Sequence, residues 1–491
     1  MAPRALWIAA TLMAAGPGPD AEDRGVTFTG AWTRWTGAGP RWGRLFYATE
    51  AGARATATVE GDQAVLIHKA GPDCGIARIL VDGKPAEPAE IDTYSPAVEW
   101  NRATVVARGL PRGPHRVVVE VTGRRNPAST DRYVQVVHIT DRPPPPPPPP
   151  WPPEKAWAWY RAIPWLAGFN YVPSTACNTT EWWQEETFDP ATIDRELGWA
   201  AGLGFNTTRV FIQYIVWKGD PEGFLKRLDR FLGTASKHGI SVMPVLFDDC
   251  AFGQPVQMDP FPGRQRDPIP GMILPSWTPS PGRKLGLDPD ERPSLRRYVR
   301  EVVGRFKDDR RVVLWDLYNE PRNSADAGSA EFLAEIFAWA REAGPSQPLS
   351  IGSWSGHAEV NHAAATLCDV TTFHCYGKRE DLRKRIDGLK ATGRPLVCTE
   401  WFARPAGSRI DTDLTLLREE KVGAYMWGLV NGRTQCQFPW WNKPGGAVDP
   451  KHGWFHDILH PDGKPYREEE IEALKRILKE GPSRPRDRGE R

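Results

Sequence analysis

The sequence carries almost no excess charge, no closely paired cysteines and no long apolar run beyond its first residues. Its 63 basic and 61 acidic residues leave a formal charge of +2. This balance gives no electrostatic basis for binding nucleic acid or an anionic membrane surface, so we predict neither as a partner. The sequence has no C-x-x-C motif and no histidine–cysteine cluster with zinc-like spacing, so we also predict no metal site.

The apolar run at the start of the sequence indicates export. Arg4 supplies a positive charge, residues 5–15 are apolar, and the small residues Ala14, Ala15 and Gly16 suit a cleavage site. This run is too short to span a bilayer, and no later stretch is long and apolar enough. We therefore predict a signal peptide at residues 1–20 and a secreted or periplasmic protein without a membrane span. Its oligomeric state stays open.

The composition then divides the chain into domains. Short β-branched or alternating segments, separated by Gly and Pro turns, fill residues 27–141 and predict an all-β sandwich of the jelly-roll kind. Eight consecutive prolines, Pro143 to Pro150, form a stiff polyproline II spacer. We therefore predict a multidomain chain with a β-sandwich at 27–141, a proline-rich linker at 142–155 and a second domain at 160–480.

The second domain alternates short apolar strands with amphipathic helices, which is typical of a parallel α/β fold. Eight such repeats predict a (β/α)8 TIM barrel, in which active sites lie at the carboxyl ends of the strands. The predicted strands are residues 166–172, 207–212, 241–247, 312–318, 349–352, 370–374, 396–399 and 423–427. The predicted helices are residues 190–203, 222–238, 292–306, 330–343, 358–367, 378–391, 412–420 and 467–479.

Two of these strands end on a glutamate in nearly the same setting. The fourth leads into Asn319, Glu320 and Pro321, and the seventh leads into Glu400 and Trp401. A carboxylate at the end of a buried strand is costly unless it has partners or a task. Two carboxylates at matching strand ends predict the acid and nucleophile pair of glycoside cleavage.

Other polar or aromatic residues occur at the same strand ends. A single one could be a satisfied core residue, whereas several at one end of a barrel are hard to explain by packing alone. They are Asn170, Arg209, Asp248, Asp249, His374, Tyr376 and Trp427.

Over residues 165–470 this pattern resembles the retaining glycoside hydrolases of family 5. The Asn-Glu-Pro motif matches at 319–321, which implies that Glu320 is the acid/base, and Glu400 matches the nucleophile. The chain departs from the family at Asp248, Asp249 and Cys250, where a histidine usually follows strand three. The resemblance and the strand-end positions together imply a substrate-binding set of Arg209, Asn319, His374, Tyr376, Trp427, Asn170, Asp248 and Trp401.

The chemistry of each carboxyl group can be stated independently. Glu400 must be ionised, and the Arg209 guanidinium and the Tyr376 phenol would favour its charged form. Glu320 must be protonated, and burial together with the negative charge of Glu400 would raise its pKa. Retention of configuration predicts carboxyl groups about 5–5.5 Å apart, against about 6.5–9.5 Å for inversion. These two groups suffice, so we predict no cofactor.

Long loops and tryptophans are expected to shape the site. Residues 248–290 and 431–457 are loops of the length that usually has a function. The 22 tryptophans supply either core packing or flat platforms for sugar rings. Cys177 and Cys436 fall in loops at this end and form one candidate disulfide. The candidate platforms in the loops are Trp182, Trp183, Trp277, Trp440, Trp441 and Trp454.

The predicted function is therefore an exported retaining β-glycoside hydrolase that cleaves a β-linked polysaccharide, such as a β-mannan, a β-glucan or a xylan. An exo-β-glycosidase or a transglycosylase acting on oligosaccharides is an alternative within the enzyme class. A carbohydrate-binding protein without catalysis is the alternative of another class. The N-terminal domain resembles accessory modules of carbohydrate-active enzymes, and both sugar binding and a structural role stay open for it.

Overall fold

The computed structural model describes residues 21–23, 25–36, 44–142, 149–252, 259–323, 330–354 and 358–479. The chain divides into two compact units, Met1–Pro146 and Pro147–Arg491. The predicted signal peptide and most of the proline run lie outside the described residues. Within the described part, no helix is both long enough and apolar enough to cross a membrane.

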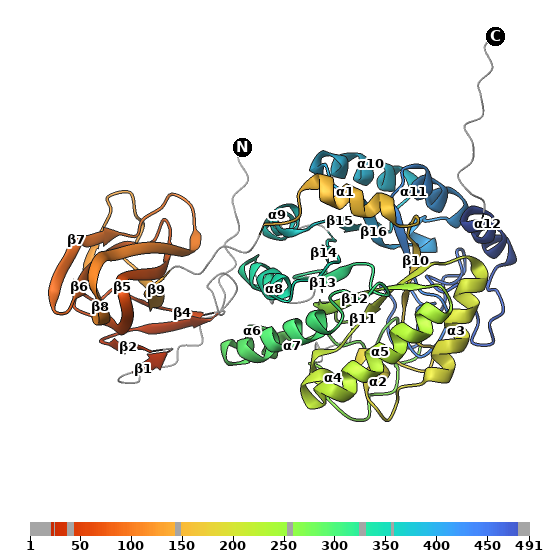
Figure 1. The fold of residues 1–491 in the computed structure, drawn as a ribbon, viewed down its shortest axis with the longest axis horizontal. Helices are drawn as coiled ribbons and strands as arrows, with labels where there is room; N and C mark the ends of the chain where they lie inside the picture. The colour runs from red at the N-terminus through yellow and green to blue at the C-terminus, as the bar shows by residue number, and fades with distance from the viewer. Residues whose placement is uncertain are drawn as a thin grey trace, which may run out of the picture. The chain divides into compact units, whose positions relative to one another are not determined.

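The N-terminal unit is built from antiparallel strands (Figure 1). They form one hydrogen-bonded sheet in the order β3-β4-β9-β5-β8-β6-β7, with β2 paired to β5 and β1 to β2. The ladder between the long strands β5 and β8 changes register near Gly61, Ala64 and His68. Such bulges bend a sheet, which is compatible with the predicted sandwich. The strands are β1 Ala21–Asp23, β2 Val26–Thr29, β3 Thr33–Thr36, β4 Arg44–Ala48, β5 Arg54–Ala70, β6 Gly75–Val81, β7 Lys84–Asp92, β8 Glu99–Arg125 and β9 Val134–Thr140.

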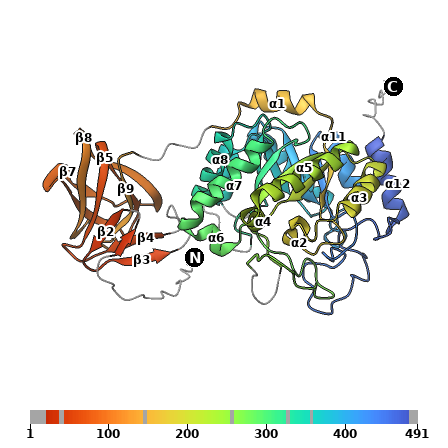
Figure 2. The same cartoon turned by 60° about the horizontal axis from the view of Figure 1, so that its bottom comes forward.

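The second unit is a barrel of eight parallel strands surrounded by helices (Figure 2). All eight predicted strands are present, in the order β14-β13-β12-β11-β10-β17-β16-β15. Between β14 and β15 side chains complete the ring: the Ser350 hydroxyl lies 2.7 Å from the Val370 carbonyl and 2.8 Å from the Thr372 hydroxyl. The strands are β10 Ala167–Tyr171, β11 Thr207–Phe211, β12 Ser241–Asp248, β13 Trp315–Asn319, β14 Leu349–Gly352, β15 Thr371–His374, β16 Leu396–Trp401 and β17 Gly423–Trp427.

The helices form where the sequence supplies a cap and an apolar stripe. In α5, the Asp220 side chain accepts from the Gly223 amide, and Pro221 occupies the first turn. Phe224, Leu228 and Phe231 then lie on the buried face at helical spacing. The larger helices are α3 Pro190–Leu203, α5 Pro221–Lys237, α7 Arg292–Arg305, α8 Ala330–Glu342, α9 Ala358–Leu367, α10 Arg379–Leu389 and α12 Glu468–Lys479. Shorter ones are α2 Thr179–Trp183, α4 Tyr214–Gly219, α6 Arg283–Leu287 and α11 Thr415–Glu419.

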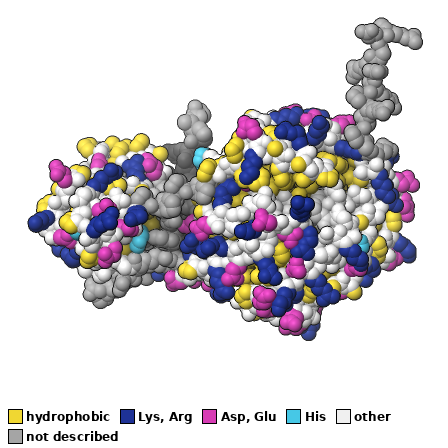
Figure 3. Space-filling view, viewed as in Figure 1, with side chains coloured by type: hydrophobic (Ala, Val, Ile, Leu, Met, Phe, Trp, Pro, Cys, Tyr) yellow, Lys and Arg dark blue, Asp and Glu magenta, His cyan; other side chains and the backbone are white. Residues whose placement is uncertain are grey.

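One predicted helix has a different form. The segment expected to be a single helix at 412–420 consists of a π-helical turn, Ile410–Leu414, followed by α11. On the face seen in Figure 3, basic and acidic side chains are interspersed over the barrel, in keeping with the balanced composition.

The predicted linker boundary is wrong, because helix α1, Pro153–Ala162, begins inside it. Proline is favoured in the first turn of a helix, so the end of the proline-rich segment concealed a helix start. The Trp151 amide donates to Asp369 (2.6 Å), and the Tyr160 hydroxyl donates to the Lys421 carbonyl (2.8 Å). These contacts make α1 part of the barrel unit.

We predict that Tyr160→Ala lowers the free energy of unfolding by about 3–5 kcal/mol, the usual cost of removing a buried aromatic ring. Denaturant unfolding of the full chain measures this loss. Ala158→Ser, on the exposed side of the same helix, should change stability by no more than about 0.5 kcal/mol. Equal small effects from both variants would show that α1 is not packed onto the barrel.

Candidate active site

A cavity of about 490 Å³ lies at the carboxyl ends of the barrel strands. Both predicted catalytic glutamates line it, together with Asp248, Asn319 and His374. Its walls are largely aromatic, which suits the apolar faces of sugar rings. The rings are Phe211, Phe252, Trp277, Trp354, Tyr376, Trp427 and Trp440.

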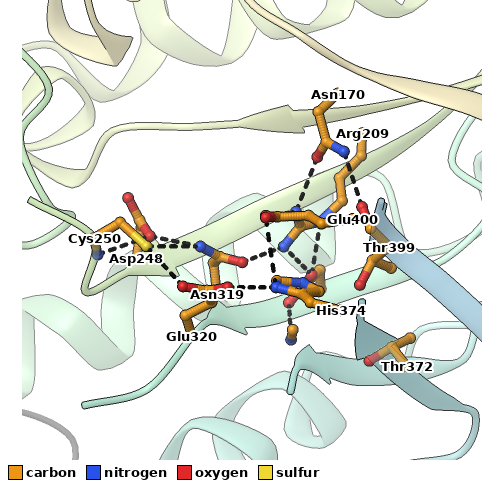
Figure 4. Close-up of polar contacts among 12 residues, drawn as sticks. Asn170, Arg209, Asp248, Cys250, Asn319, Glu320, Thr372, His374, Thr399 and Glu400 are labelled. Carbon is orange, nitrogen blue, oxygen red and sulfur yellow. Dashed lines mark hydrogen bonds and ion pairs between the residues drawn. The ribbon is translucent and has the colours of Figure 1, made fainter. Parts of the chain in front are cut away.

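Glu320 is held directly after β13 by a strained backbone and three side chains (Figure 4). Its φ of +41° is unusual for a residue other than glycine, and its amide donates to the Gly352 carbonyl at 2.9 Å. Its Oε1 lies 2.5 Å from His374 Nδ1. Its Oε2 accepts from the Cys250 thiol at 3.2 Å and from the Asn323 amide group. Burial raises the pKa of Glu320, although these two donors and Arg209 oppose the rise.

Glu400 lies in β16 with a stronger set of partners. Its Oε1 is 2.7 Å from Arg209 Nη1, and its Oε2 accepts from the Tyr376 hydroxyl at 2.6 Å. One carboxyl oxygen of Glu400, one of Glu320 and a ring nitrogen of His374 lie within 4.8 Å of one another. That spacing would admit a cation, but the Arg209 guanidinium already places a positive charge there, which opposes a second one.

Burial and hydrogen bonding act on Glu400 in opposite directions. Burial is the larger effect and raises the pKa of Glu400 from its ordinary value of 4.5. Arg209 favours the charged form, as predicted, and the Tyr376 hydroxyl acts in the same direction. The effect of burial on this residue was not predicted from the sequence.

Arg209 connects the site to the barrel core. Its side chain is fully buried and is 2.8 Å from Asp316 Oδ2. It also donates to Asn170 Oδ1 at 2.9 Å and to Asn319 Oδ1 at 2.6 Å (Figure 4). Asp316 was missed by the sequence analysis because it lies inside β13, where only core residues were expected. The predicted Asn170 and Arg209 therefore lie behind the cavity surface and support it.

His374 and Asp248 contact this group of residues from two strands: His374 lies next to Glu320, and Asp248 next to Asn319. Burial lowers the pKa of His374 to about 4, so the imidazole next to Glu320 is neutral at pH 7. Asp248 accepts from Asn319 Nδ2 at 2.8 Å and from Trp277 Nε1 at 2.7 Å. Burial raises the pKa of Asp248 to about 6. Asp248 thus fixes Trp277 at the cavity wall.

Several predicted platforms lie elsewhere. Trp401 is 2% exposed, packs in the barrel core and is not among the described residues that line the cavity. Trp182 and Trp183 stack on each other in the same core, with centroids 4.5 Å apart. The prediction that Trp401 binds substrate, made from its place next to Glu400, is therefore wrong. For Trp182 and Trp183, where packing and binding were both open, the structure shows packing. Trp427, Trp277 and Trp440 do line the cavity.

Other lining residues had no signal in the sequence. Cys250 and Asn323 contact Glu320, and His456 approaches the Tyr376 ring at 5.5 Å. All three come from loops, where position follows from tertiary contacts. The candidate disulfide is also wrong, since Cys177 and Cys436 are both free thiols.

The model of the cellulase family, glycosyl hydrolase family 5, matches residues 170–433, more than half of the chain. The chain belongs to glycosyl hydrolase family 5. It is a retaining glycoside hydrolase, as its sequence predicted, and its substrates are β-glycans. No curated protein matches the sequence of this family 5 enzyme.

The chain is also similar to several solved structures of glycoside-cleaving enzymes and related proteins. A GH5_18 structure from Streptomyces cattleya in complex with GlcNAc is 16% identical, with a TM-score of 0.45 over 65% of this chain and 82% of that one. An exo-β-1,4-mannosidase from Opitutaceae bacterium strain TAV5 is 18% identical, with a TM-score of 0.44 over 64% and 58%. An endo-β-1,4-mannanase from Thermotoga petrophila is 15% identical, with a TM-score of 0.41 over 64% and 76%.

We predict that Arg209→Met lowers the free energy of unfolding by about 3–5 kcal/mol at pH 7, because it leaves buried carboxylates without their cation. The folded-state pKa of Glu400 is already above 4.5, and losing Arg209 raises it further. The stability deficit should therefore shrink as the pH falls toward 4.5 and Glu400 takes up a proton.

Denaturant unfolding at pH 7 and pH 5 measures both effects. Arg297→Met is the control, because Arg297 is 62% exposed and pairs with Glu301 at the surface. It should cost no more than about 1 kcal/mol at either pH. A deficit for Arg209→Met that is equally large at both pH values would contradict the role given to Glu400.

Proposed function

We propose that this family 5 enzyme is exported and cleaves a β-linked polysaccharide, a β-mannan, a β-glucan or a xylan, by double displacement. Glu400 is the nucleophile and Glu320 the acid/base. The observation that carries the proposal is the placement of the two carboxyl groups in one cavity, with oxygens within 4.8 Å of each other. Oxygens this close are compatible with the retaining geometry, in which the two carboxyl groups lie about 5–5.5 Å apart.

In the first step, a Glu400 oxygen attacks the anomeric carbon and forms a glycosyl ester. The bond to the leaving oxygen breaks, and Glu320 gives its proton to that oxygen. The Arg209 guanidinium holds Glu400 Oε1 and the Tyr376 hydroxyl donates to Oε2, so the two groups orient the carboxyl group for attack. Burial supports the protonated form of Glu320 that this step needs.

In the second step, Glu320 takes a proton from a water molecule, which attacks the anomeric carbon and releases Glu400. Esterification has removed the negative charge of Glu400, so the pKa of Glu320 falls and the carboxylate can act as a base. The neutral His374 at 2.5 Å can donate to that carboxylate without adding a charge of its own.

An exo-acting glycosidase is the second candidate, because three loops are joined beside the cavity. The Leu274 amide donates to the Thr434 carbonyl at 2.7 Å, which links the loops after β12 and β17. Asn178 Nδ2, in the loop after β10, donates to the Ser276 carbonyl at 2.8 Å. A wall of this kind can close one end of a groove, and a closed end favours release of single sugars.

We predict that a panel of soluble β-mannan, β-glucan, xylan and aryl β-glycosides identifies the sugar and the mode of cleavage. A ladder of products from one polysaccharide supports the endo reading, whereas release of monosaccharide alone supports the exo reading. The anomeric form of the first product, followed by NMR, should match that of the substrate. Sugar transfer that exceeds hydrolysis would identify a transglycosylase instead.

We predict that Glu400→Gln abolishes turnover on every active substrate, and that Glu320→Gln lowers it by roughly 10²–10⁴-fold on natural linkages, which need a general acid. Both variants should still bind oligosaccharide. Glu196→Gln is the control, since Glu196 is buried but contacts Tyr171 and Ser174 away from the cavity. A wild type as inactive as both site variants would leave a carbohydrate-binding protein as the function.

A further inference from the structure

Cys250 is the side chain at the site that neither the sequence motifs nor the proposed chemistry explains. It lies two residues after the end of β12, is 7% exposed and lines the cavity. Its thiol is free, donates to Glu320 Oε2 at 3.2 Å and accepts from Asn319 Nδ2 at 3.5 Å. Its own amide donates to Asp248 Oδ1 at 3.1 Å, which fixes the backbone that carries the thiol (Figure 4).

We propose that Cys250 is a positioning residue for Glu320, and that its thiol supports the acid form and the base form of that carboxyl group in turn. The inference rests on the proposed role of Glu320 as the acid/base. It assigns a task to the segment 248–250, where this chain departs from the usual histidine of its family.

Three side-chain groups surround the Glu320 carboxyl group. On Oε2 the carboxyl group meets the Cys250 thiol and the Asn323 amide group, and on Oε1 it meets His374. The ionised carboxylate can accept from all three. An amide nitrogen cannot accept a hydrogen bond, so when Oε2 carries the proton only the thiol on that side can turn and accept it.

The Asn319 contact sets the resting direction of the thiol. Because the Asn319 amide points a hydrogen at the sulfur, the S–H bond is directed toward Glu320 rather than back toward Asn319. Asp248 Oδ1 accepts from both the Asn319 side-chain amide and the Cys250 backbone amide, so one carboxylate fixes both residues. The Cys250 thiol thereby restrains the Glu320 carboxyl group in the cavity without competing for its proton.

The charges that face Glu320 set the expected sign of a substitution. Arg209 on β11 lowers its pKa. The other titratable groups that face Glu320 are Glu400 on β16, Asp248 on β12 and His374 on β15, of which His374 is neutral at pH 7. Burial raises the pKa of Glu320, and the thiol donor lowers it. Removing the donor should therefore raise that pKa, and a stronger donor should lower it.

The test compares Cys250→Ala with Cys250→Ser in the full-length enzyme. The probes are two aryl β-glycosides of the sugar that the substrate panel identifies, one with a poor 4-methylphenol leaving group and one with a good 2,4-dinitrophenol leaving group. The alkaline limb of kcat/KM against pH reports the protonated acid. It should move to higher pH in the alanine variant and to lower pH in the serine variant.

The size of the effect should also depend on the leaving group. Cys250→Ala should lower kcat/KM about 3- to 10-fold on the poor leaving group, the value of one ordinary hydrogen bond, and less than 2-fold on the good one, which needs little acid assistance. Cys250→Ser should recover most of that loss. The inference would be overturned if the alkaline limbs of the two variants moved in the same direction or did not move. Equal losses of kcat/KM on both probes would also overturn it.

Two further variants separate this inference from the proposed function. Cys375 also lines the cavity, but its contact with Glu400 is through the backbone amide, so Cys375→Ser should not displace the alkaline limb. Glu320→Gln on the same two probes tests the acid/base role itself. If its losses are equal on both probes, the proposed function fails; if they differ and only the Cys250 variants are silent, the inference alone fails.

Discussion

The buried guanidinium of Arg209 is the interaction on which the site depends. A fully buried charge is costly unless it is paired and hydrogen-bonded, and Arg209 is paired with Asp316 and Glu400. Its remaining donors reach Asn170 and Asn319. These partners come from β10, β13 and β16, which are brought around one cation only by a closed barrel. The closed barrel and the ion-paired position of Glu400 therefore depend on the same buried cation.

Contact with Arg209 also distinguishes Glu400 from Glu320, although the two side chains are buried to a similar degree. Burial raises the pKa of both. Glu400 is in direct contact with the cation and a phenol, whereas Glu320 contacts a neutral imidazole, a thiol and an amide. The different roles that we propose for Glu400 and Glu320 thus follow from their partners and not from their depth. Different partners are the general way in which one site holds a carboxylate and a carboxylic acid together.

Much of the barrel could be predicted from the sequence because its strands are short apolar runs with polar ends. Glu320, Glu400 and His374 stand where those runs stop, so both the element and the site were visible together. The roles of Asp316 and Trp401 were not visible, because the sequence around each consists of buried residues. Only the tertiary contacts show that Asp316 is an ion-pair partner and that Trp401 packs in the core. Helix α1 was not predicted because the prolines before it indicated a linker. The contact of Cys250 with Glu320 was not predicted because Cys250 lies in a loop, where position follows from tertiary contacts.

Specificity lies in the part of the structure that the sequence pattern describes least. The loops after β12 and β17 meet at Gly271, where a Cβ would lie 2.3 Å from the Gly446 backbone nitrogen and where φ is +85°. The Gly445 amide donates to the Pro270 carbonyl at 2.8 Å in the same contact. Any side chain at Gly271 would separate the two loops. This backbone contact joins the loops that carry Leu274 and Trp440, both of which line the cavity, whereas Glu320 and Glu400 are positioned by the strands beneath it.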